Sequence, residues 1–497
     1  MFLTLDVGTT SVKVCVLNKA FKVLAKTGIE YVLETSNNKA ELSPQIYWDS
    51  IAQGINQVGL NCNLKDVKGI SITTQGETLI PVDINGAALH NAIVWLDTRA
   101  IKEAESINKV VDQKYFFSKT GIPECNGLCP ISKLLWFKNN EADIYNQAKY
   151  FLLLEDFIIW KLTGKFVTEK SLLSTTGYFD LTADDLWVEI FDLLELDVNK
   201  IPTVMGCAEV VGEILPGVAN DLGLNQGIKI VTGAMDQVCG AIGAGNFNSN
   251  IITETTGTAL CIGTTRKSEA IDTTTFIPVY RHFNKDLQLL LPVCMTAGMA
   301  LKWFKDIFCK EEDAAAIKDG VSVYEKLSNL AKRSPPLANG LTILPYFSGT
   351  IQPIFAPDCK ATFSGIGLHT TKSDFVRGIM EGVGYMLKEN IILLKATDTQ
   401  IVSMGGGANS PIWNQIKADI LNTDVIVPSE SETTSIGVAM LCALGLSVYK
   451  TLEEAHNLIK QETTKYSPNK QNVSVYCQGF NRYKALSKMA TGDCNGS

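Results

Sequence analysis

The stretch that decides the fold is LTLDVGTTSVKVCVLNK, Leu3 to Lys19. Two apolar runs rich in β-branched residues flank a Gly-Thr-Thr-Ser centre, which predicts two strands joined by a turn. Asp6 ends the first run, although Asp and Gly are both disfavoured in strand interiors. An ordinary hairpin explains this pattern, because both residue types are common in turns.

The functional interpretation of the same hairpin is a phosphate-binding turn. Glycine lets the backbone approach a phosphate closely, and the hydroxyl and amide groups that follow it are donors. Asp6 would then hold Mg²⁺, since this ion prefers carboxylate, water and phosphate oxygens. The candidate phosphate ligands of the turn are Gly8, Thr9, Thr10, Ser11 and Lys13.

The composition indicates a large folded protein that acts on small molecules. The 497 residues are 46% hydrophobic and 19% charged, which suits roughly two to four domains with large cores. A net charge of −8 argues against nucleic acid as a partner. Two uncharged stretches, 287–301 and 433–449, are shorter than the roughly 20 residues of a membrane span, so we expect no membrane partner.

The cysteines and the N-terminus favour a cytoplasmic location. The 13 cysteines include no CxxC pair, and the 4 histidines are far apart, so reduced thiols are expected rather than a zinc site. The chain enters a strand at once, without the features of a signal peptide.

A second cluster of expected strands spans residues 228–265, and residues 251–263 within it repeat the pattern of the opening stretch. An apolar run leads to TTGT, residues 255–258, and a further apolar run follows. Repetition of this kind indicates two related domains, which we expect at 1–246 and 247–497 in a mixed α/β fold. A second plain hairpin is the alternative, but paired turns would suit a polyphosphate held from both sides.

Asp236 lies in VTGAMDQVCGAIGAG, residues 231–245, between an expected strand and a Gly/Ala-rich helix. As a helix N-cap it would accept hydrogen bonds from backbone N–H groups. As a general base, a partly desolvated carboxylate would take the proton of a hydroxyl that attacks phosphorus. The two interpretations are compatible, because capping would hold the carboxylate rigidly.

Polar side chains in residues 69–100 suit a polyhydroxylated ligand. Carboxylates and amides bind hydroxyl groups, and an indole packs on a carbon chain. A polar loop with a surface Asp–Arg pair is the alternative. The side chains in question are those of Gln75, Glu77, Trp95, Asp97 and Arg99.

Residues 399–422, TQIVSMGGGANSPIWNQIKADILN, predict a strand, a glycine turn and an amphipathic helix. Such a unit presents free backbone N–H groups at the start of the helix.

These segments together resemble the FGGY carbohydrate kinases, most closely the xylulokinase-like members. Matching segments run in order from residue 3 to about 485 and include LDVGTTSVKV, ITTQGET, AIVWLDTRA, GAMDQVCGAIGAG, TTGTAL, TAGMALKWF and GGGANSPIWNQIKAD. The resemblance implies two actin-like (ribonuclease H-like) ATPase domains, with mixed sheets flanked by helices and the active site in the interdomain cleft. It implies that 1–246 binds the sugar and that 247–497 binds ATP, with Mg²⁺. Members of the family often form homodimers, so a homodimer is an expectation here.

Carried over position by position, the resemblance gives individual residues a role. Asp236 looks like the general base, with Gln237 beside it in the sugar site. The implied sugar pocket is lined by Gln75, Gly76, Glu77 and Trp95. The implied ATP contacts are Thr9, Thr10 and Ser11 in the first phosphate loop, Thr258 in the second, and Gly298, Lys302, Gly406 and Ser410 around the nucleotide.

Departures from the family pattern leave the sugar open. Glycerol kinases carry Arg-Glu where this chain reads Gly76-Glu77, which argues against glycerol. Xylulokinases typically carry Met-His-Gly in this region, and SGTIQP (348–353) lacks the charged pair usual after Ser-Gly in close xylulokinases. D-Xylulose is the first expectation, with D-ribulose, other ketoses and erythritol-like polyols as alternatives. A rival is an ATPase without a sugar substrate, which would lack the pocket segments QGET (75–78) and VWLD (94–97). A second rival is a non-catalytic sugar sensor, which the retained Asp6, Asp236 and both threonine turns disfavour.

Overall fold

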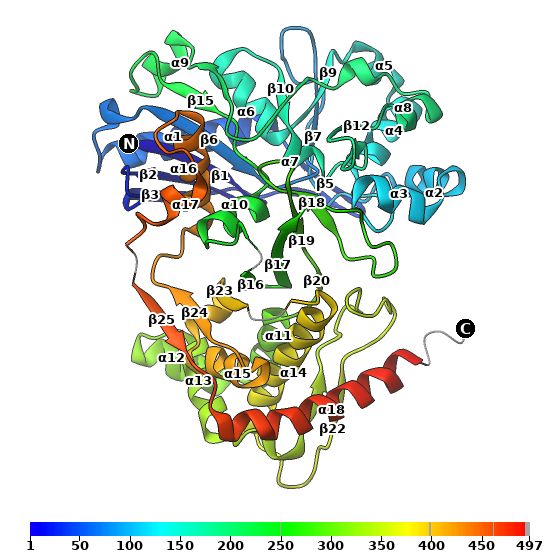
Figure 1. Ribbon diagram of the computed structural model, residues 1–497, viewed down its shortest axis with the longest axis vertical. Helices are drawn as coiled ribbons and strands as arrows, with labels where there is room; N and C mark the ends of the chain where they lie inside the picture. The colour runs from blue at the N-terminus through cyan, green and yellow to red at the C-terminus, as the bar shows by residue number, and fades with distance from the viewer. Residues whose placement is uncertain (249, 397–398, 461, 493–497) are drawn as a thin grey trace. The chain divides into compact units, whose positions relative to one another are not determined.

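The computed structural model describes residues 1–248, 250–396, 399–460 and 462–492. The chain divides into two compact units, and most of its helices and strands are labelled in Figure 1. Unit 1 comprises residues 1–247, 266–289 and 432–460, and unit 2 comprises 248–265, 290–431 and 461–497. The first division lies beside the boundary expected near residue 246, and unit 1 also contains two segments from the second half of the chain.

The central sheet of unit 1 has six strands in the order β14-β15-β6-β1-β2-β3. Their bounds are β1 Phe2–Val7, β2 Ser11–Leu17, β3 Val23–Glu30, β6 Gly69–Thr74, β14 Val210–Glu213 and β15 Lys229–Val231. β1 is antiparallel to β2 and parallel to β6. The opening stretch therefore forms the expected hairpin, and its first strand lies inside the sheet.

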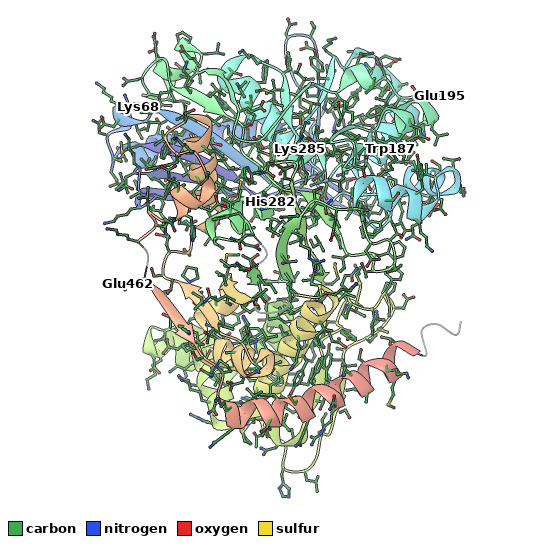
Figure 2. The ribbon with its side chains drawn as sticks, in the orientation of Figure 1. Lys68, Trp187, Glu195, His282, Lys285 and Glu462 are labelled. Atoms are coloured by element: carbon green, nitrogen blue, oxygen red, sulfur yellow. The ribbon has the colours of Figure 1, made fainter. Side chains whose placement is uncertain are left out.

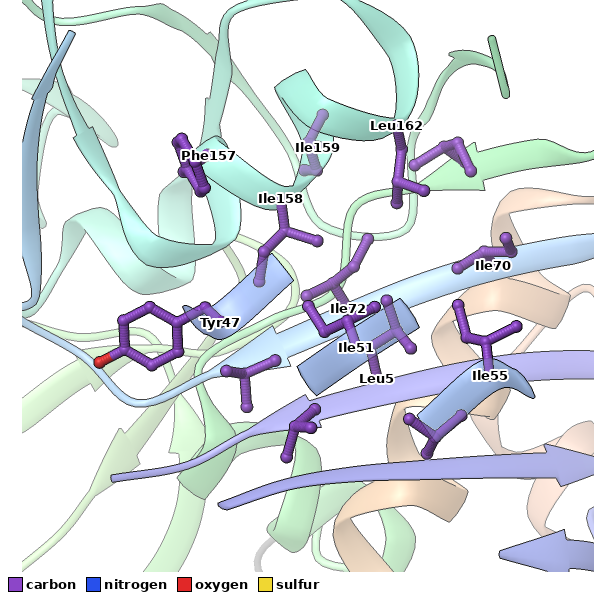
Figure 3. Close-up of a cluster of buried hydrophobic side chains, with 14 of the residues drawn as sticks. Leu5, Tyr47, Ile51, Ile55, Ile70, Ile72, Phe157, Ile158, Ile159 and Leu162 are labelled. Carbon is purple, nitrogen blue, oxygen red and sulfur yellow. The ribbon is translucent and has the colours of Figure 1, made fainter. Parts of the chain in front are cut away.

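One face of this sheet carries the hydrophobic core. Helices α1 (Pro44–Gly59) and α6 (Leu154–Thr163) cover it. Figure 3 shows Leu5, Ile70 and Ile72 of the sheet beside Tyr47, Ile51, Ile55, Ile158, Ile159 and Leu162 of the two helices. Because strand residues alternate between faces, Asp6 lies on the opposite face from Leu5.

Helices α10 (Asp236–Gly243) and α16 (Thr433–Gly445) lie on the face that carries Asp6. Their backbones touch: a Cβ atom on Gly243 would lie 1.8 Å from the carbonyl oxygen of Thr433. On the other helix, a Cβ atom on Gly437 would lie 1.9 Å from the carbonyl oxygen of Cys239. Only glycine fits at this crossing, which fixes where α10 begins relative to the sheet.

Further elements of unit 1 surround this sheet. A second sheet has the order β4-β5-β8-β7-β9, formed by Glu34–Ser36, Lys39–Leu42, Ala92–Ile93, Leu79–Val82 and Tyr150–Leu153. Further helices of unit 1 are α2 Ile101–Val110, α3 Gln113–Thr120, α4 Pro130–Asn140, α5 Ala142–Gln147, α7 Lys170–Leu173, α8 Val188–Leu193 and α9 Pro216–Asp221.

The strands of unit 2 include five neighbours in the order β17-β16-β23-β24-β25, and β20 pairs with β17. Their bounds are β16 Ile251–Thr256, β17 Leu260–Lys267, β20 Val293–Cys294, β23 Gln400–Met404, β24 Val425–Pro428 and β25 Thr463–Tyr466. β16 is antiparallel to β17 and parallel to β23. This is the arrangement of β1 with β2 and β6, so the repeat seen in the sequence extends to the topology.

The helices of unit 2 include α11 Gly298–Phe308, α12 Lys310–Asp319, α13 Val323–Arg333, α14 Lys372–Leu393, α15 Pro411–Leu421 and α18 Lys470–Gly492. The expected strand, glycine turn and helix of residues 399–422 are β23, the short helix η4 (Gly406–Asn409) and α15. In the described parts of the chain, every helix is too short or too polar to cross a membrane.

Candidate active site

The turn of the first hairpin is held by its own backbone and by Tyr31. The Gly8 N–H donates to the Ser11 carbonyl at 3.0 Å, and the Tyr31 hydroxyl donates to the Gly8 carbonyl at 2.5 Å. The Tyr31 N–H donates to the Thr10 carbonyl at 2.9 Å. The Thr10 side chain is exposed, so the turn is rigid while a threonine hydroxyl faces solvent.

Lys13, a candidate phosphate ligand, forms an ion pair instead in this structure. Its ammonium lies 3.4 Å from Glu432 Oε2, and Lys26 lies 3.2 Å from Glu432 Oε1. Lys13 is opposite Asp6 in the β1–β2 pairing. The pair keeps a cation beside the Asp6 carboxylate.

Asp236 is the first residue of α10, one position inside the helix rather than the N-cap. Three side chains hold the preceding segment, residues 233–235. The hydroxyl of Thr73 donates to the carbonyl of residue 234 at 2.6 Å, and Glu155 Oε1 accepts from the N–H of residue 233 at 2.9 Å. Ser171 Oγ accepts from the N–H of residue 235 at 2.9 Å. Hydrogen bonds with three side chains therefore hold the backbone that leads into Asp236.

Burial and a neighbouring carboxylate set the protonation of Asp236. Burial first, and then the charge of Asp6, raise the pKa of Asp236 to about 7, although the hydrogen bond from the N–H of Gln237 (2.6 Å) lowers it. Burial also raises the pKa of Asp6 to about 6, against the charge of Lys13. A carboxylate that titrates near neutral pH suits general-base chemistry.

Gln75 follows β6 and offers an acceptor atom. Its N–H donates to the Val7 carbonyl at 3.0 Å, and its Nε2 donates to the Tyr47 hydroxyl at 3.3 Å. The side chain is 4% exposed, and within the described residues no group hydrogen-bonds its Oε1. A buried acceptor without a partner is costly, so a ligand hydroxyl would satisfy it.

Gly76 and Glu77 form a tight turn after Gln75. A Cβ atom on Gly76 would lie 3.1 Å from Thr175 Oγ1. Glu77 has φ 60°, in the left-handed region that non-glycine residues rarely occupy. Burial raises the pKa of Glu77, the charge of Asp236 raises it too, and the charge of Lys133 lowers it. The Glu77 carboxylate thus interacts electrostatically with Asp236.

Trp95 joins the sugar-side candidates to the first turn. Its indole Nε1 donates to Thr9 Oγ1 at 2.9 Å. The structure therefore brings a residue expected in the sugar pocket against one expected to contact phosphate.

Asp97 and Arg99 form a buried structural pair rather than a surface pair. Asp97 Oδ2 accepts from the Ala40 N–H at 2.7 Å, and Asp97 Oδ1 accepts from Arg99 Nε at 2.9 Å. Arg99 also donates to Glu41 at 2.5 Å. These groups are engaged with each other, which leaves the Asp97 carboxylate little capacity for a ligand.

In unit 2 the structure brings Thr258 next to Gly298. The Thr258 carbonyl accepts from the Ala297 N–H at 2.9 Å, and the Gly298 N–H donates to the Gly257 carbonyl at 2.8 Å. A Cβ atom on Gly298 would lie 2.4 Å from that carbonyl oxygen. Lys302 follows on α11, exposed, with its ammonium 2.6 Å from Asp306 Oδ2.

The glycine turn before α15 packs on the same hairpin. A Cβ atom on Gly407 would lie 2.6 Å from the Thr256 Cβ, whereas one on Gly406 would have no atom within 4 Å. Ser410 caps α15, accepting from the Trp413 N–H at 3.4 Å, and its hydroxyl lies 2.8 Å from the hydroxyl of Ser328. Thr258, Gly298 and Gly406 thus lie on turns packed around one hairpin, and open space adjoins Gly406.

A buried ion pair lies under these turns. Glu254 and Lys417 are both 0% exposed, with 2.5 Å between Glu254 Oε1 and the ammonium. Glu254 Oε2 accepts from the Thr256 hydroxyl at 2.7 Å, and Ser403 also donates to this carboxylate. The pair links β16, β23 and α15 below the second threonine turn.

The fold and these clusters define a class of protein. The family model of the N-terminal domain of the FGGY carbohydrate kinases matches residues 1–243, and that of the C-terminal domain matches residues 253–446. The chain therefore belongs to the FGGY family and is a carbohydrate kinase.

Named relatives agree with this class. Xylulose kinase from Bacillus subtilis (strain 168) is 31% identical, with 97% of this chain and 95% of the relative covered. Gluconokinase from the same organism is 28% identical, with 89% of this chain and 86% of the relative covered. The structure of ligand-bound xylulose kinase from Lactobacillus acidophilus has the same fold, with a TM-score of 0.89 and 24% identity. The match covers 99% of this chain and 100% of that one.

Sequence reasoning overlooked the residues that support the candidate site. Tyr47, Glu155, Ser171 and Lys133 contact its backbone or side chains, yet none was singled out. Lys133 carried a signal, because it is the one charged residue in the apolar run PISKLLWF, residues 130–137. A charged residue within a buried helix face calls for a partner.

Proposed function

We propose that this carbohydrate kinase transfers the γ-phosphate of ATP to a hydroxyl of a neutral ketopentose. D-Xylulose is the first candidate substrate. The observation that carries the proposal is the placement of Asp236, half-buried at the first position of α10 on a segment held by three side chains. The 31% identity with a xylulose kinase supports the choice of sugar.

In the proposed reaction, Asp236 takes the proton of the attacking sugar hydroxyl. The oxygen forms a bond to the γ-phosphorus, the bond to the β-phosphate oxygen breaks, and ADP leaves. The sugar is held by Gln75, Gly76, Glu77, Trp95 and Gln237. The N–H of Gln237 favours the ionised form of Asp236, so the base is oriented before the hydroxyl arrives.

For ATP, we propose contacts from both threonine turns. These are Gly8, Thr9, Thr10, Ser11 and Lys13 in the first, Thr258 in the second, and Gly298, Lys302, Gly406 and Ser410 near the nucleoside. The exposed hydroxyls of Thr10 and Thr258 support this assignment, since such groups donate to phosphate oxygens.

The carboxylates of unit 1 fit Mg²⁺. This ion is usually held by one or two carboxylates together with substrate phosphates and water. The charge of Asp6 raises the pKa of Asp236, so the two carboxylates interact electrostatically. In the described residues no three His, Cys, Asp or Glu side chains group to hold a metal. We propose Asp6 as the protein ligand; the bound ion would offset the charge of the phosphates.

Gluconate is the second candidate, because a relative with 28% identity is a gluconokinase. Its carboxylate would enter a pocket that already holds Glu77 and Asp236. Repulsion between like charges disfavours that substrate, so the neutral sugar is preferred. D-Ribulose, erythritol-like polyols and glycerol are further substrates to test, and a non-catalytic sensor is the rival without turnover.

A coupled ADP-release assay tests the proposal. Wild-type enzyme with Mg²⁺·ATP is measured on D-xylulose, D-ribulose, erythritol, glycerol and gluconate. We expect the highest kcat/KM on D-xylulose, and a loss of about 10²–10⁴ in kcat for Asp236→Asn. Near-normal kcat in this variant would remove Asp236 as the base. Protein that binds ATP and sugar without turnover would support the sensor.

The domain roles remain predictions: sugar binding by 1–246 and ATP binding by 247–497, in an interdomain cleft. A cytoplasmic location and a homodimer are also predictions.

A further inference from the structure

Lys133 is a buried cation that the proposed reaction does not use. It lies on α4 and is 0% exposed. Within the described residues, no carboxylate oxygen lies within 4.0 Å of its ammonium, so Lys133 forms no ion pair there. A buried charge is costly unless it is satisfied by hydrogen bonds. The location of its hydrogen bonds therefore indicates its role.

The ammonium of Lys133 donates to two backbone carbonyls. Nζ lies 3.0 Å from the Glu77 oxygen and 3.1 Å from the Val94 oxygen. The first carbonyl belongs to the turn of residues 75–77, and the second immediately precedes Trp95. Two of the segments that carry sugar-side residues are thus joined by one side chain from a helix.

The turn at Glu77 needs such a support. Its φ of 60° is unfavourable for a residue with a side chain, and a conformation of this kind persists only where the surroundings enforce it. Thr175 packs against Gly76 from one side, where a Cβ atom would lie 3.1 Å from its Oγ1. Lys133 holds the turn through the Glu77 carbonyl.

We propose that Lys133 is a positioning residue of the sugar site: its ammonium fixes the 75–77 turn and Trp95 in one relative geometry. This inference rests on the proposed function, because the sugar is what those segments would bind. Lys133 acts through the backbone and does not touch the reacting atoms. Its charge also favours the ionised form of Glu77.

Lys138 offers a matched control on the same helix. Its ammonium also donates to two backbone carbonyls, those of Leu194 (3.1 Å) and Glu195 (2.8 Å). Glu195 is labelled in Figure 2, and its side chain is 87% exposed. Lys138→Met removes the same kind of contact, together with a partly exposed ion pair to Glu195 Oε2 at 3.3 Å, without touching the sugar-side segments.

The experiment compares Lys133→Met, Lys133→Gln and Lys138→Met with wild type. KM for D-xylulose and for ATP, kcat and the melting temperature are measured for each protein. For Lys133→Met we expect the kcat/KM for the sugar to fall about 10- to 100-fold, while KM for ATP changes less than about twofold. Lys133→Gln keeps a donor and is expected to lie between Lys133→Met and wild type. Lys138→Met should change only the melting temperature.

The outcomes separate this inference from the proposed function. Wild-type enzyme that is inactive on every sugar would overturn both. Active wild type with unchanged sugar kcat/KM in a folded Lys133 variant would overturn the inference alone. Equal loss in KM for ATP and for sugar would also overturn it, since that pattern indicates general damage. If Lys133→Met does not fold, Lys133→Gln decides between these outcomes.

Discussion

Replacing Lys417 by methionine would leave the carboxylate of Glu254 buried without its ion-pair partner. Both side chains are 0% exposed, and the ammonium lies 2.5 Å from Glu254 Oε1. The Glu254 carboxylate would keep its hydrogen bond from the Thr256 hydroxyl at 2.7 Å. The Ser403 hydroxyl would also still donate to this carboxylate. Two neutral donors do not replace a cation in a buried site, so we expect a large destabilisation of unit 2.

The magnitude follows from the burial of the pair. Removing one partner of a buried ion pair typically costs about 3–5 kcal/mol. For a unit of the size of unit 2, each kcal/mol lowers the melting temperature by about 2–4 °C. The variant is therefore expected to melt about 6–20 °C below wild type.

Differential scanning calorimetry of four proteins measures this effect. They are wild type, Lys417→Met, Glu254→Gln and the double variant. The double variant carries no unpaired charge, so its loss should be clearly smaller than the sum of the two single losses. Lys388→Met is the control, because Lys388 on α14 donates to the Ile420 carbonyl (2.6 Å) rather than to a carboxylate. We expect it to lower the melting temperature by only about 2–4 °C.

The same proteins report on the second threonine turn. Because Glu254 accepts from Thr256, loosening the pair should raise KM for ATP more than KM for the sugar. Additive losses in the double variant would refute the reasoning that the two charges are coupled. A melting temperature in Lys417→Met equal to that of Lys388→Met would refute the assigned cost of the buried charge.

Three further predictions concern unit 1. Burial raises the pKa of Asp236 to about 7, and a base works only when deprotonated, so kcat/KM for the sugar should fall about tenfold per pH unit below that value; a flat profile between pH 5 and 8 would contradict this. Asp6→Asn should raise the Mg²⁺ concentration that gives half-maximal rate, and an unchanged Mg²⁺ titration would remove its metal role. Gly243→Ala would place a Cβ atom 1.8 Å from the Thr433 carbonyl oxygen, so the α10–α16 crossing must separate and the melting temperature should fall by several degrees; a melting temperature like that of wild type would contradict the close packing.

The sequence by itself determined the two hairpins. The two apolar runs of Leu3–Lys19 form the antiparallel strands β1 and β2, joined by the expected turn. Residues 251–263 repeat that pattern and form β16 and β17. Alternation along β1 also explains why Leu5 is in the core while Asp6 faces the other way. Local propensities and periodicity suffice for such features, because they depend on neighbouring residues along the chain.

The tertiary structure decided which distant groups meet. Lys133 reaches the carbonyls of Glu77 and Val94, and Trp95 donates to Thr9. Residues 432–460 join unit 1 although they follow the whole sheet of unit 2 except β25. Such contacts depend on how helices and strands pack at large sequence separation, which no local pattern encodes. The raised pKa of Asp236 has the same origin, since burial by the folded chain is its main cause.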